Sequence, residues 1–256
     1  MLFDPGKESF HLLHRRFSFG DDFKLLGVVF DTGLLMHRAA REVATEAGWR
    51  LQTLLRVRRF FSTPELFGLY KAQVLSYLES GTPALFHAAP SVLDRVDRVQ
   101  RRFLRELGFS EEAALRDYRL SPLNARRDMA MLGTLHKVNL GSAPAQLRLL
   151  FLRRGALPRA PWTDRLRSLR PLHGKQLNTP ATPYSTDVFQ RSLFGLAQLY
   201  NRLPEHVVES TSVKVFQRKL QQALLRWAEL GATDWQCLYS TGWKRLPLQR
   251  FDELYA

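Results

Sequence analysis

The segment of residues 90–108 constrains the fold most, because it carries a complete helix signature. Pro90 stands at its start and Gly108 at its end, the positions that these residues favour at helix boundaries. Its apolar residues recur every three or four positions: Val92, Val96, Val99, Phe103 and Leu107. Such spacing places them in one stripe of a helix. We therefore expect an amphipathic helix with one buried face.

Similar signals recur from residue 33 onward, so we expect a mainly α-helical chain. Residues 34–61 predict one long helix or two abutting helices, with a break near Gly48 as the alternative. Ser62-Thr63-Pro64-Glu65 supplies a cap, a proline at the first helical position and an early acid, so a helix should run from there towards Glu79. Further helices are expected over residues 111–118, 123–140, 144–152 and 212–230.

β structure is expected mainly near the N-terminus. Residues 23–31 are dense in β-branched and aromatic side chains and predict a strand or hairpin. Two shorter segments, 10–13 and 184–194, also have strand character. The expected fold is thus a short N-terminal β-hairpin, then a helical bundle, then a smaller helical C-terminal part.

The same signals divide the chain into four parts. Residues 1–32 hold the hairpin, and residues 33–152 are expected to form the larger helical domain. Prolines 158, 161, 171, 180 and 183 preclude long regular elements in residues 153–184, which also carry many arginines. We interpret that stretch as a basic linker and residues 185–256 as a helical C-terminal extension.

The charge of the chain indicates its kind of partner. Against 24 acidic residues stand 38 basic ones, for a net charge of +14 and a pI near 10.5. Eight of the 38 are lysines, which leaves 30 arginines. The arginine fork can grip a phosphate with two hydrogen bonds. A polyanion is the expected partner, with nucleic acid ahead of an acidic membrane surface; a GC-rich genome is the alternative origin of the arginines.

Two clusters of basic residues are candidate phosphate contacts. Four arginines of segment 90–108 step by three, four and three positions, on a different face from the valines: Arg95, Arg98, Arg102 and Arg105. This spacing suits a row of contacts along a phosphate backbone. A solvated face balanced by Asp94, Asp97 and Glu106 is an equally good interpretation. The second cluster directly precedes Phe60-Phe61: Arg56, Arg58 and Arg59.

Catalytic and metal-binding patterns are not evident. Asp21-Asp22 resembles a metal-binding pair, but its position directly before a strand favours a polar turn over a Mg²⁺-dependent nuclease. The seven histidines are scattered, and one cysteine excludes a disulfide within the chain. The N-terminus does not resemble a signal peptide, and no stretch approaches the roughly 18 apolar residues of a membrane span. We expect a soluble, intracellular protein without catalytic residues or a bound metal.

Several segments, in order, resemble the region downstream of the catalytic site in reverse transcriptases of non-LTR (LINE-type) retrotransposons. Phe23-Lys24-Leu25-Leu26-Gly27-Val28-Val29-Phe30-Asp31 is similar to the family's primer-grip hairpin, and Asp4-Pro5-Gly6-Lys7-Glu8 to the palm motif before it. Residues 69–84, 94–107 and 200–216 resemble later motifs, among them Val99-Gln100-Arg101-Arg102-Phe103-Leu104-Arg105. Together these segments cover nearly the whole chain.

The resemblance implies a right-hand polymerase fold for the parent enzyme, with RNA-templated DNA synthesis and Mg²⁺ as cofactor. This chain would supply the end of the palm, a helical thumb and a C-terminal extension, while the catalytic carboxylates belong to missing palm and fingers regions. Its expected partner is an RNA/DNA primer–template duplex, bound without sequence specificity. The alternative is a helical protein-interaction module. The expected nucleic-acid contacts are Lys24, Arg56, Arg58, Arg59, Arg95, Arg98, Arg101, Arg102 and Arg105.

Overall fold

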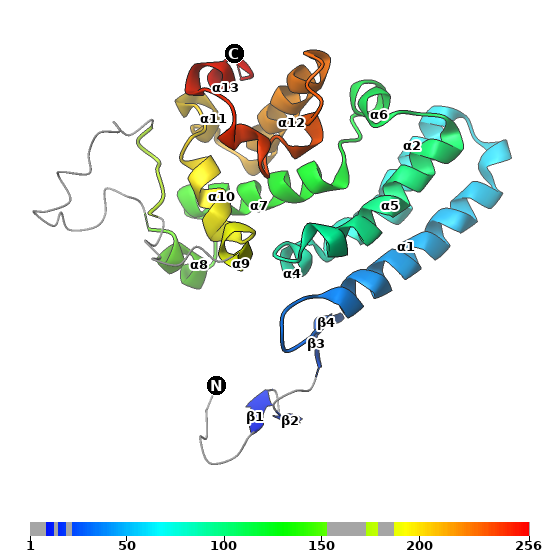
Figure 1. Cartoon of the computed structure of the whole chain (residues 1–256), viewed down its shortest axis with the longest axis horizontal. Coiled ribbons are helices and arrows are strands. Elements are labelled where there is room, and N and C mark those ends of the chain that lie inside the picture. Colours follow the sequence, from blue (N-terminus) through cyan, green and yellow to red (C-terminus); the bar gives the residue numbers. More distant parts are fainter. Residues whose placement is uncertain (1–8, 13–14, 19–21, 153–172, 179–186, 256) are drawn as a thin grey trace, which may run out of the picture. The chain divides into compact units, whose positions relative to one another are not determined.

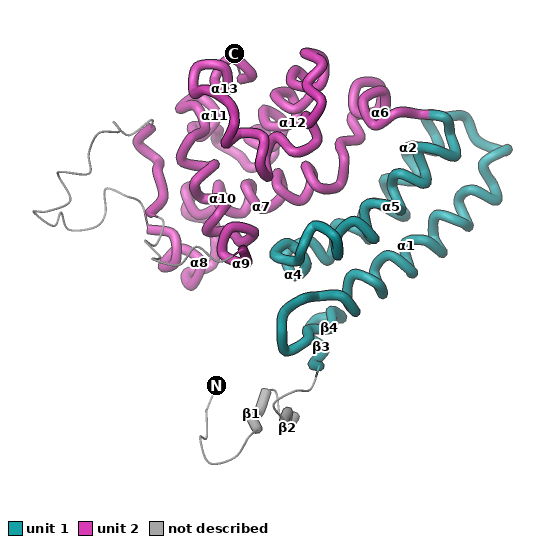
Figure 2. Tube along the Cα trace, viewed as in Figure 1, with its two compact units in different colours: residues 1–108 teal, residues 109–256 magenta. Residues whose placement is uncertain are grey.

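The computed structural model describes residues 9–12, 15–18, 22–152, 173–178 and 187–255 (Figure 1). The described chain is mainly helical, and it divides into two compact units, residues 1–108 and 109–256 (Figure 2). The division falls inside the range 33–152 and assigns residues 109–152 to the same unit as the C-terminal part. Most of the proline-rich range 153–184 lies outside the described residues.

Unit 1 contains two antiparallel strand pairs. β1 (Ser9–Leu12) pairs with β2 (Arg15–Ser18), and β3 (Phe23–Leu25) pairs with β4 (Val28–Phe30). The hairpin expected over residues 23–31 is therefore confirmed. Leu26 and Gly27 both have positive φ, 48° and 85°, which is the backbone of a two-residue turn that glycine favours. Of the short segment 10–13, residue 13 lies outside the described residues.

The other described elements of unit 1 are helices and helical turns. In chain order they are α1 (His37–Arg56), the 3₁₀ turn η1 (Arg58–Phe60), α2 (Thr63–Tyr70), the π-helical turn η2 (Lys71–Leu75), α3 (Ser76–Ser80), α4 (Thr82–Leu85) and α5 (Pro90–Leu107). α1 and α5 lie side by side and run in the same direction, while α2, η2 and α3 return between their ends (Figure 1). α1 continues through Gly48 without a break.

The core of unit 1 is built on the apolar stripe of α5. Val92, Val96 and Val99 are buried, and Phe103 is fully buried, whereas Leu107 is half-exposed. The ring of Phe103 stacks on Tyr70 at 4.1 Å between centroids and meets the edge of Phe67 at 5.2 Å. The buried face that the sequence predicts for this helix is confirmed, and it packs on α2 and α1.

The start of α2 follows the capping pattern of residues 62–65. Ser62 and Glu65 form a capping box, in which the Ser62 backbone N–H donates to the Glu65 carboxylate at 2.7 Å. The helical run then continues to Ser80, but its middle, Lys71–Leu75, is π-helical. A wide turn of this kind changes which carbonyls find partners within the helix.

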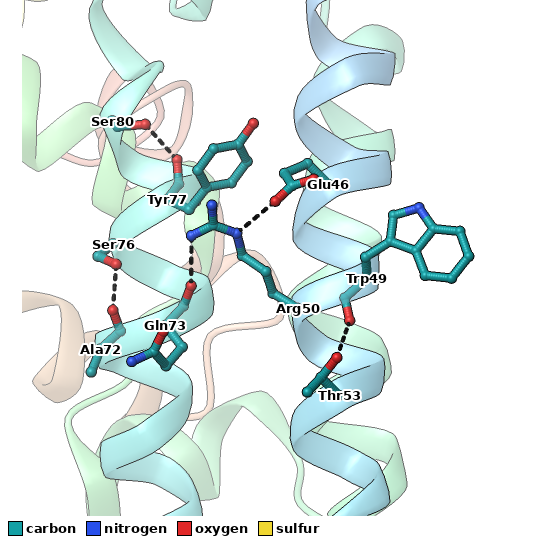
Figure 3. A network of polar contacts seen from close by, with 9 residues as sticks. All are labelled: Glu46, Trp49, Arg50, Thr53, Ala72, Gln73, Ser76, Tyr77 and Ser80. Atoms are coloured by element: carbon teal, nitrogen blue, oxygen red, sulfur yellow. Dashed lines mark hydrogen bonds and ion pairs between the residues drawn. The ribbon is translucent and has the colours of Figure 1, made fainter.

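Arg50 of α1 contacts this wide turn directly (Figure 3). Its guanidinium donates to the Gln73 carbonyl at 3.4 Å, lies 4.2 Å from the centre of the Tyr77 ring and pairs with Glu46 at 3.0 Å. One side chain thus joins α1 to η2 and α3. Its planar fork and its stacking on the ring are properties that a lysine ammonium does not share.

Replacing Arg50 by alanine is expected to lower the free energy of unfolding of unit 1 by about 1–2 kcal/mol, since it removes a charge-assisted hydrogen bond and a cation–π contact from a partly exposed site. Urea denaturation of the whole chain measures the change. Arg41→Ala is the control, because Arg41 is an exposed α1 arginine that makes no ion pair among the described residues. Equal stability losses in the two variants would contradict the bridging role.

The described part of unit 2 is mainly helical too. Its elements are α6 (Glu111–Tyr118), α7 (Leu123–Asn139), α8 (Ala145–Leu150), α9 (Asp187–Gln190), α10 (Leu193–Tyr200), α11 (Glu205–Val208), α12 (Val213–Glu229), the 3₁₀ turns η5 (Trp235–Cys237) and η6 (Gly242–Lys244), and α13 (Leu248–Glu253). α10 and α12 both pack on α7, which is why residues 109–152 join this unit. None of the described helices has the length and apolar character needed to cross a membrane.

A polar network lies inside the core of unit 2. His136 is fully buried and stacks on Phe216 at 4.3 Å between ring centroids. One imidazole nitrogen, Nε2, lies 2.9 Å from the Ser210 carbonyl, and the other, Nδ1, lies 2.9 Å from the Tyr200 hydroxyl. Because a carbonyl only accepts, Nε2 carries the proton and the Tyr200 hydroxyl donates to Nδ1. The Tyr200 oxygen in turn accepts from the Asn139 side chain at 2.9 Å.

The strand character assigned to residues 184–194 was wrong within the described residues. Residues 187–190 form α9, and α10 begins at residue 193. The Ser192 hydroxyl accepts from the Phe194 backbone N–H at 3.2 Å, which caps α10, and Gly195 packs so closely on the Gln190 carbonyl that a Cβ would lie 2.0 Å from that oxygen. The apolar residues here are adjacent pairs, Val188-Phe189 and Leu193-Phe194, rather than an alternating run, and the cap and the tight turn determine a helix.

Candidate nucleic-acid interface

The outer face of α5 carries the arginines that the sequence singled out. All five are exposed: Arg95, Arg98, Arg101, Arg102 and Arg105. At about 100° per residue, the row formed by Arg95, Arg98, Arg102 and Arg105 is centred roughly 110° around the helix from the valine face. At 1.5 Å per residue the row extends over about 15 Å of the helix, which equals the rise of four or five phosphates of one strand measured along the axis of a duplex.

Asp94 balances part of this charge. Its carboxylate pairs with Arg98 at 2.6 Å and also with Arg101. The hydrogen bond from Arg101, helped by that from Arg98, holds the pKa of the Asp94 carboxyl below its usual value. The interpretation of α5 as a balanced, solvated face therefore fits these two arginines.

The other three arginines of the α5 face have no carboxylate partner among the described residues. Among the described residues, Arg95, Arg102 and Arg105 make no ion pair and no side-chain hydrogen bond. An exposed guanidinium without a carboxylate partner loses no existing contact when it binds a phosphate. These three side chains are the best candidates for phosphate contacts on α5.

The second cluster lies at the same end of unit 1 as the end of α5. In the η1 turn, Arg58 pairs with the Glu106 carboxylate at 3.1 Å and donates to the Glu106 backbone carbonyl at 3.3 Å. These contacts join residues 48 positions apart in the sequence. Exposed Arg59 belongs to the same turn, and exposed Arg56 is the last residue of α1, directly before it. We call the residues Arg56, Arg59, Arg102 and Arg105 the basic end of unit 1.

Lys24 lies elsewhere in unit 1. It is exposed on β3, and the partner strand β4 packs against α1. At the same end of unit 1, the start of α1, the His87 imidazole lies 3.0 Å from the Leu34 carbonyl. α1 has 20 residues, which corresponds to a length of about 30 Å between the hairpin and the basic end. The structure thus brings together the arginines of η1 and α5 but leaves Lys24 at the opposite end.

Sequence reasoning did not assign a role to two aromatic side chains of the basic end. Phe60 is 68% exposed and Phe61 is 40% exposed, and the Arg59 guanidinium lies 4.7 Å from the centre of the Phe60 ring. Their signal in the sequence is an aromatic pair directly after three closely spaced arginines. A pair of this kind in a helix would be assigned to a core, and only the turn geometry exposes it.

The described residues do not form a recognisable metal site. Within the part of the chain that the structure describes, no group of three or more histidine, cysteine, aspartate or glutamate side chains could hold a metal ion. Asp22 is exposed and pairs with Arg38 of α1 at 3.4 Å, and Asp21 lies outside the described residues.

No protein-family model, no curated protein and no solved structure matches the chain.

Proposed function

We propose that unit 1 binds the phosphate backbone of nucleic acids through the exposed face of α5. The observation that carries the proposal is the row of three arginines, Arg95, Arg102 and Arg105, which have no ion-pair partner among the described residues. The helix fixes the spacing of their Cα atoms, because its apolar face is packed into the core of unit 1. A rigid row of open guanidinium groups is suited to a regular row of phosphates.

The binding that this surface offers is independent of base sequence. Contacts from arginine to phosphate fix position and register, whereas sequence is read on the edges of the bases. Affinity should therefore depend steeply on salt, since each phosphate that is neutralised releases counterions.

We further propose that the chain is a non-catalytic, thumb-side part of an RNA-directed DNA polymerase of the non-LTR retrotransposon type. What supports this proposal is the order of the motifs along the sequence, together with a β-hairpin over residues 23–30 and a helix over residues 90–107 where the resemblance expects them. On this proposal, α5 would hold the primer–template duplex, and the metal-binding carboxylates would be supplied by other parts of the polymerase.

A salt titration tests the binding proposal. A blunt RNA–DNA duplex of 20 base pairs, labelled for fluorescence anisotropy, is titrated with the whole chain between 50 and 300 mM KCl. If three arginines contact phosphates, the logarithm of the affinity should fall with that of the salt concentration with a slope of about −2.7 or steeper. Replacing Arg95, Arg102 and Arg105 by alanine should reduce the slope by about 1 for each arginine.

The matched control changes the net charge by the same amount at other sites. Arg41, Arg148 and Arg218 are exposed and make no ion pair among the described residues, so their triple alanine variant has the charge of the first one. A flat salt dependence, or equal losses in the two triple variants, would contradict specific use of the α5 face. Equal competition by polyglutamate would instead favour a protein-interaction module.

A further inference from the structure

The aromatic pair of the basic end is an unusual surface feature. Phe60 exposes 68% of its surface and Phe61 40%. Exposed aromatic rings beside cationic groups are typical of contact sites for other molecules. A ligand for this site should have both flat apolar surfaces and negative charge.

The fold holds this site in a defined shape. Phe60 closes the η1 turn, which the Arg58–Glu106 ion pair and the hydrogen bond to the Glu106 carbonyl fasten to the end of α5. The Arg59 guanidinium lies 4.7 Å from the ring centre, so it contacts the ring while most of the ring surface stays open. A ring and a guanidinium held together form a platform on which a third flat group can stack.

We propose that Phe60 and Phe61 stack on unpaired bases of a nucleic-acid strand. Every base has a flat π-face, and its phosphates are the anions that Arg56, Arg102 and Arg105 can contact. Bases inside a duplex are already stacked on their neighbours, so the occupant is a single-stranded segment that continues from a duplex on α5. The inference rests on the proposed backbone binding and adds to it a preference for duplexes with an overhang.

Charge decides against an apolar protein helix as the occupant. The basic end carries four exposed arginines (Arg56, Arg59, Arg102 and Arg105), of which Arg59 contacts the Phe60 ring, and in a chain of net charge +14 they favour a polyanion. Combining aromatic platforms with a positively charged track is how proteins bind single strands without sequence preference.

The test compares two duplexes. One is the blunt 20-base-pair duplex, and the other carries a single-stranded overhang of six nucleotides. The native chain should bind the overhang duplex about tenfold more tightly, the effect of stacking one base on an aromatic side chain. The double variant Phe60→Leu, Phe61→Leu keeps apolar side chains but removes the π-faces, so it should lose this preference and keep its affinity for the blunt duplex and its salt slope.

Phe60→Trp is the matched control, because it preserves an aromatic ring at the site and should retain the preference. Far-UV circular dichroism checks that each variant folds. Equal binding of the two duplexes by the native chain overturns the stacking inference and leaves the backbone proposal standing. The same holds if the leucine variant keeps the preference. If the native chain binds neither duplex, the stacking inference and the backbone-binding proposal are both overturned. If polyglutamate displaces the overhang duplex but free single strand does not, the site belongs to a protein partner and the stacking inference is overturned.

Discussion

Replacing Phe103 by alanine should destabilise unit 1 by about 3–5 kcal/mol, the usual loss when a large aromatic side chain is removed from a core. Phe103 is fully buried, and its ring contacts both Tyr70 and Phe67. The change therefore leaves a cavity at the point where α5 meets α2. A whole domain is stable by only about 5–15 kcal/mol, so the variant should lose much of the stability of unit 1.

Urea denaturation gives the total change, and hydrogen exchange of peptides from α2 and α5 assigns it to unit 1. Phe103→Leu should cost less than Phe103→Ala, because it fills part of the cavity. Phe60→Ala is the control for loss of an aromatic side chain from an exposed position, where changes of about 0.5 kcal/mol or less are usual. A loss below about 1.5 kcal/mol for Phe103→Ala would show that α5 does not depend on this contact.

The second large effect expected is loss of stability of unit 2 in mild acid. Burial lowers the pKa of the His136 imidazole and of the His173 imidazole below the ordinary value. The unfolded chain therefore binds more protons than the folded one as the pH falls below about 6.5. Stability is complete above that pH and is lost below it, by at most about 1.4 kcal/mol per pH unit for each histidine until the folded form also takes up the proton.

The network around His136 explains why a second proton is unfavourable there. Nδ1 accepts from the Tyr200 hydroxyl, so a proton on Nδ1 would turn that donor away inside a core. The positive charge of Lys175 lowers the pKa further, although less than burial does. His173 faces the Tyr200 carbonyl at 3.2 Å and is buried in the same region.

The measurement is the free energy of unfolding at pH 7.5, 6.5 and 5.5, with hydrogen exchange of α7 peptides as the local readout. His136→Gln should weaken the dependence on pH, and His37→Gln, at an exposed position, should leave it unchanged. A free energy of unfolding that stays constant from pH 7.5 to 5.5 would contradict the burial of neutral histidines in unit 2.

Local signals predicted much of the helical structure. Residues 90–107 and 111–118 form helices with the boundaries that their proline, serine and glycine residues indicate, and Gly108 adopts φ of 74° at the end of α5. These boundaries depend on groups within a few positions of one another. The π-helical turn Lys71–Leu75 was not predicted, because its Gln73 carbonyl bonds to Arg50, 23 residues earlier in the chain.

The candidate site was predicted less completely. The arginine row and the cluster near residue 58 follow from spacing alone. The choice of partner does not: within α5, Asp94 pairs with Arg98 and Arg101 and leaves Arg95 open. Nor does the long-range ion pair by which Glu106 fastens the η1 turn to α5. Periodicity places side chains on a face, but it does not say which neighbour each charge chooses.

The parallel course of α1 and α5 has an electrostatic consequence. Both helices end beside the η1 turn, so the partial negative charges of two helix macrodipoles, about half an elementary charge each, gather at the basic end. Arg56 and Arg105 lie in the last turns of these helices and offset that charge. The net field there is consequently weaker than four arginines suggest, whereas Arg95, ten residues before Arg105, stands outside it. About three of the four positive charges remain, so long-range attraction of a polyanion should still be stronger at the basic end than along the middle of α5, where Asp94 offsets Arg98 and Arg101.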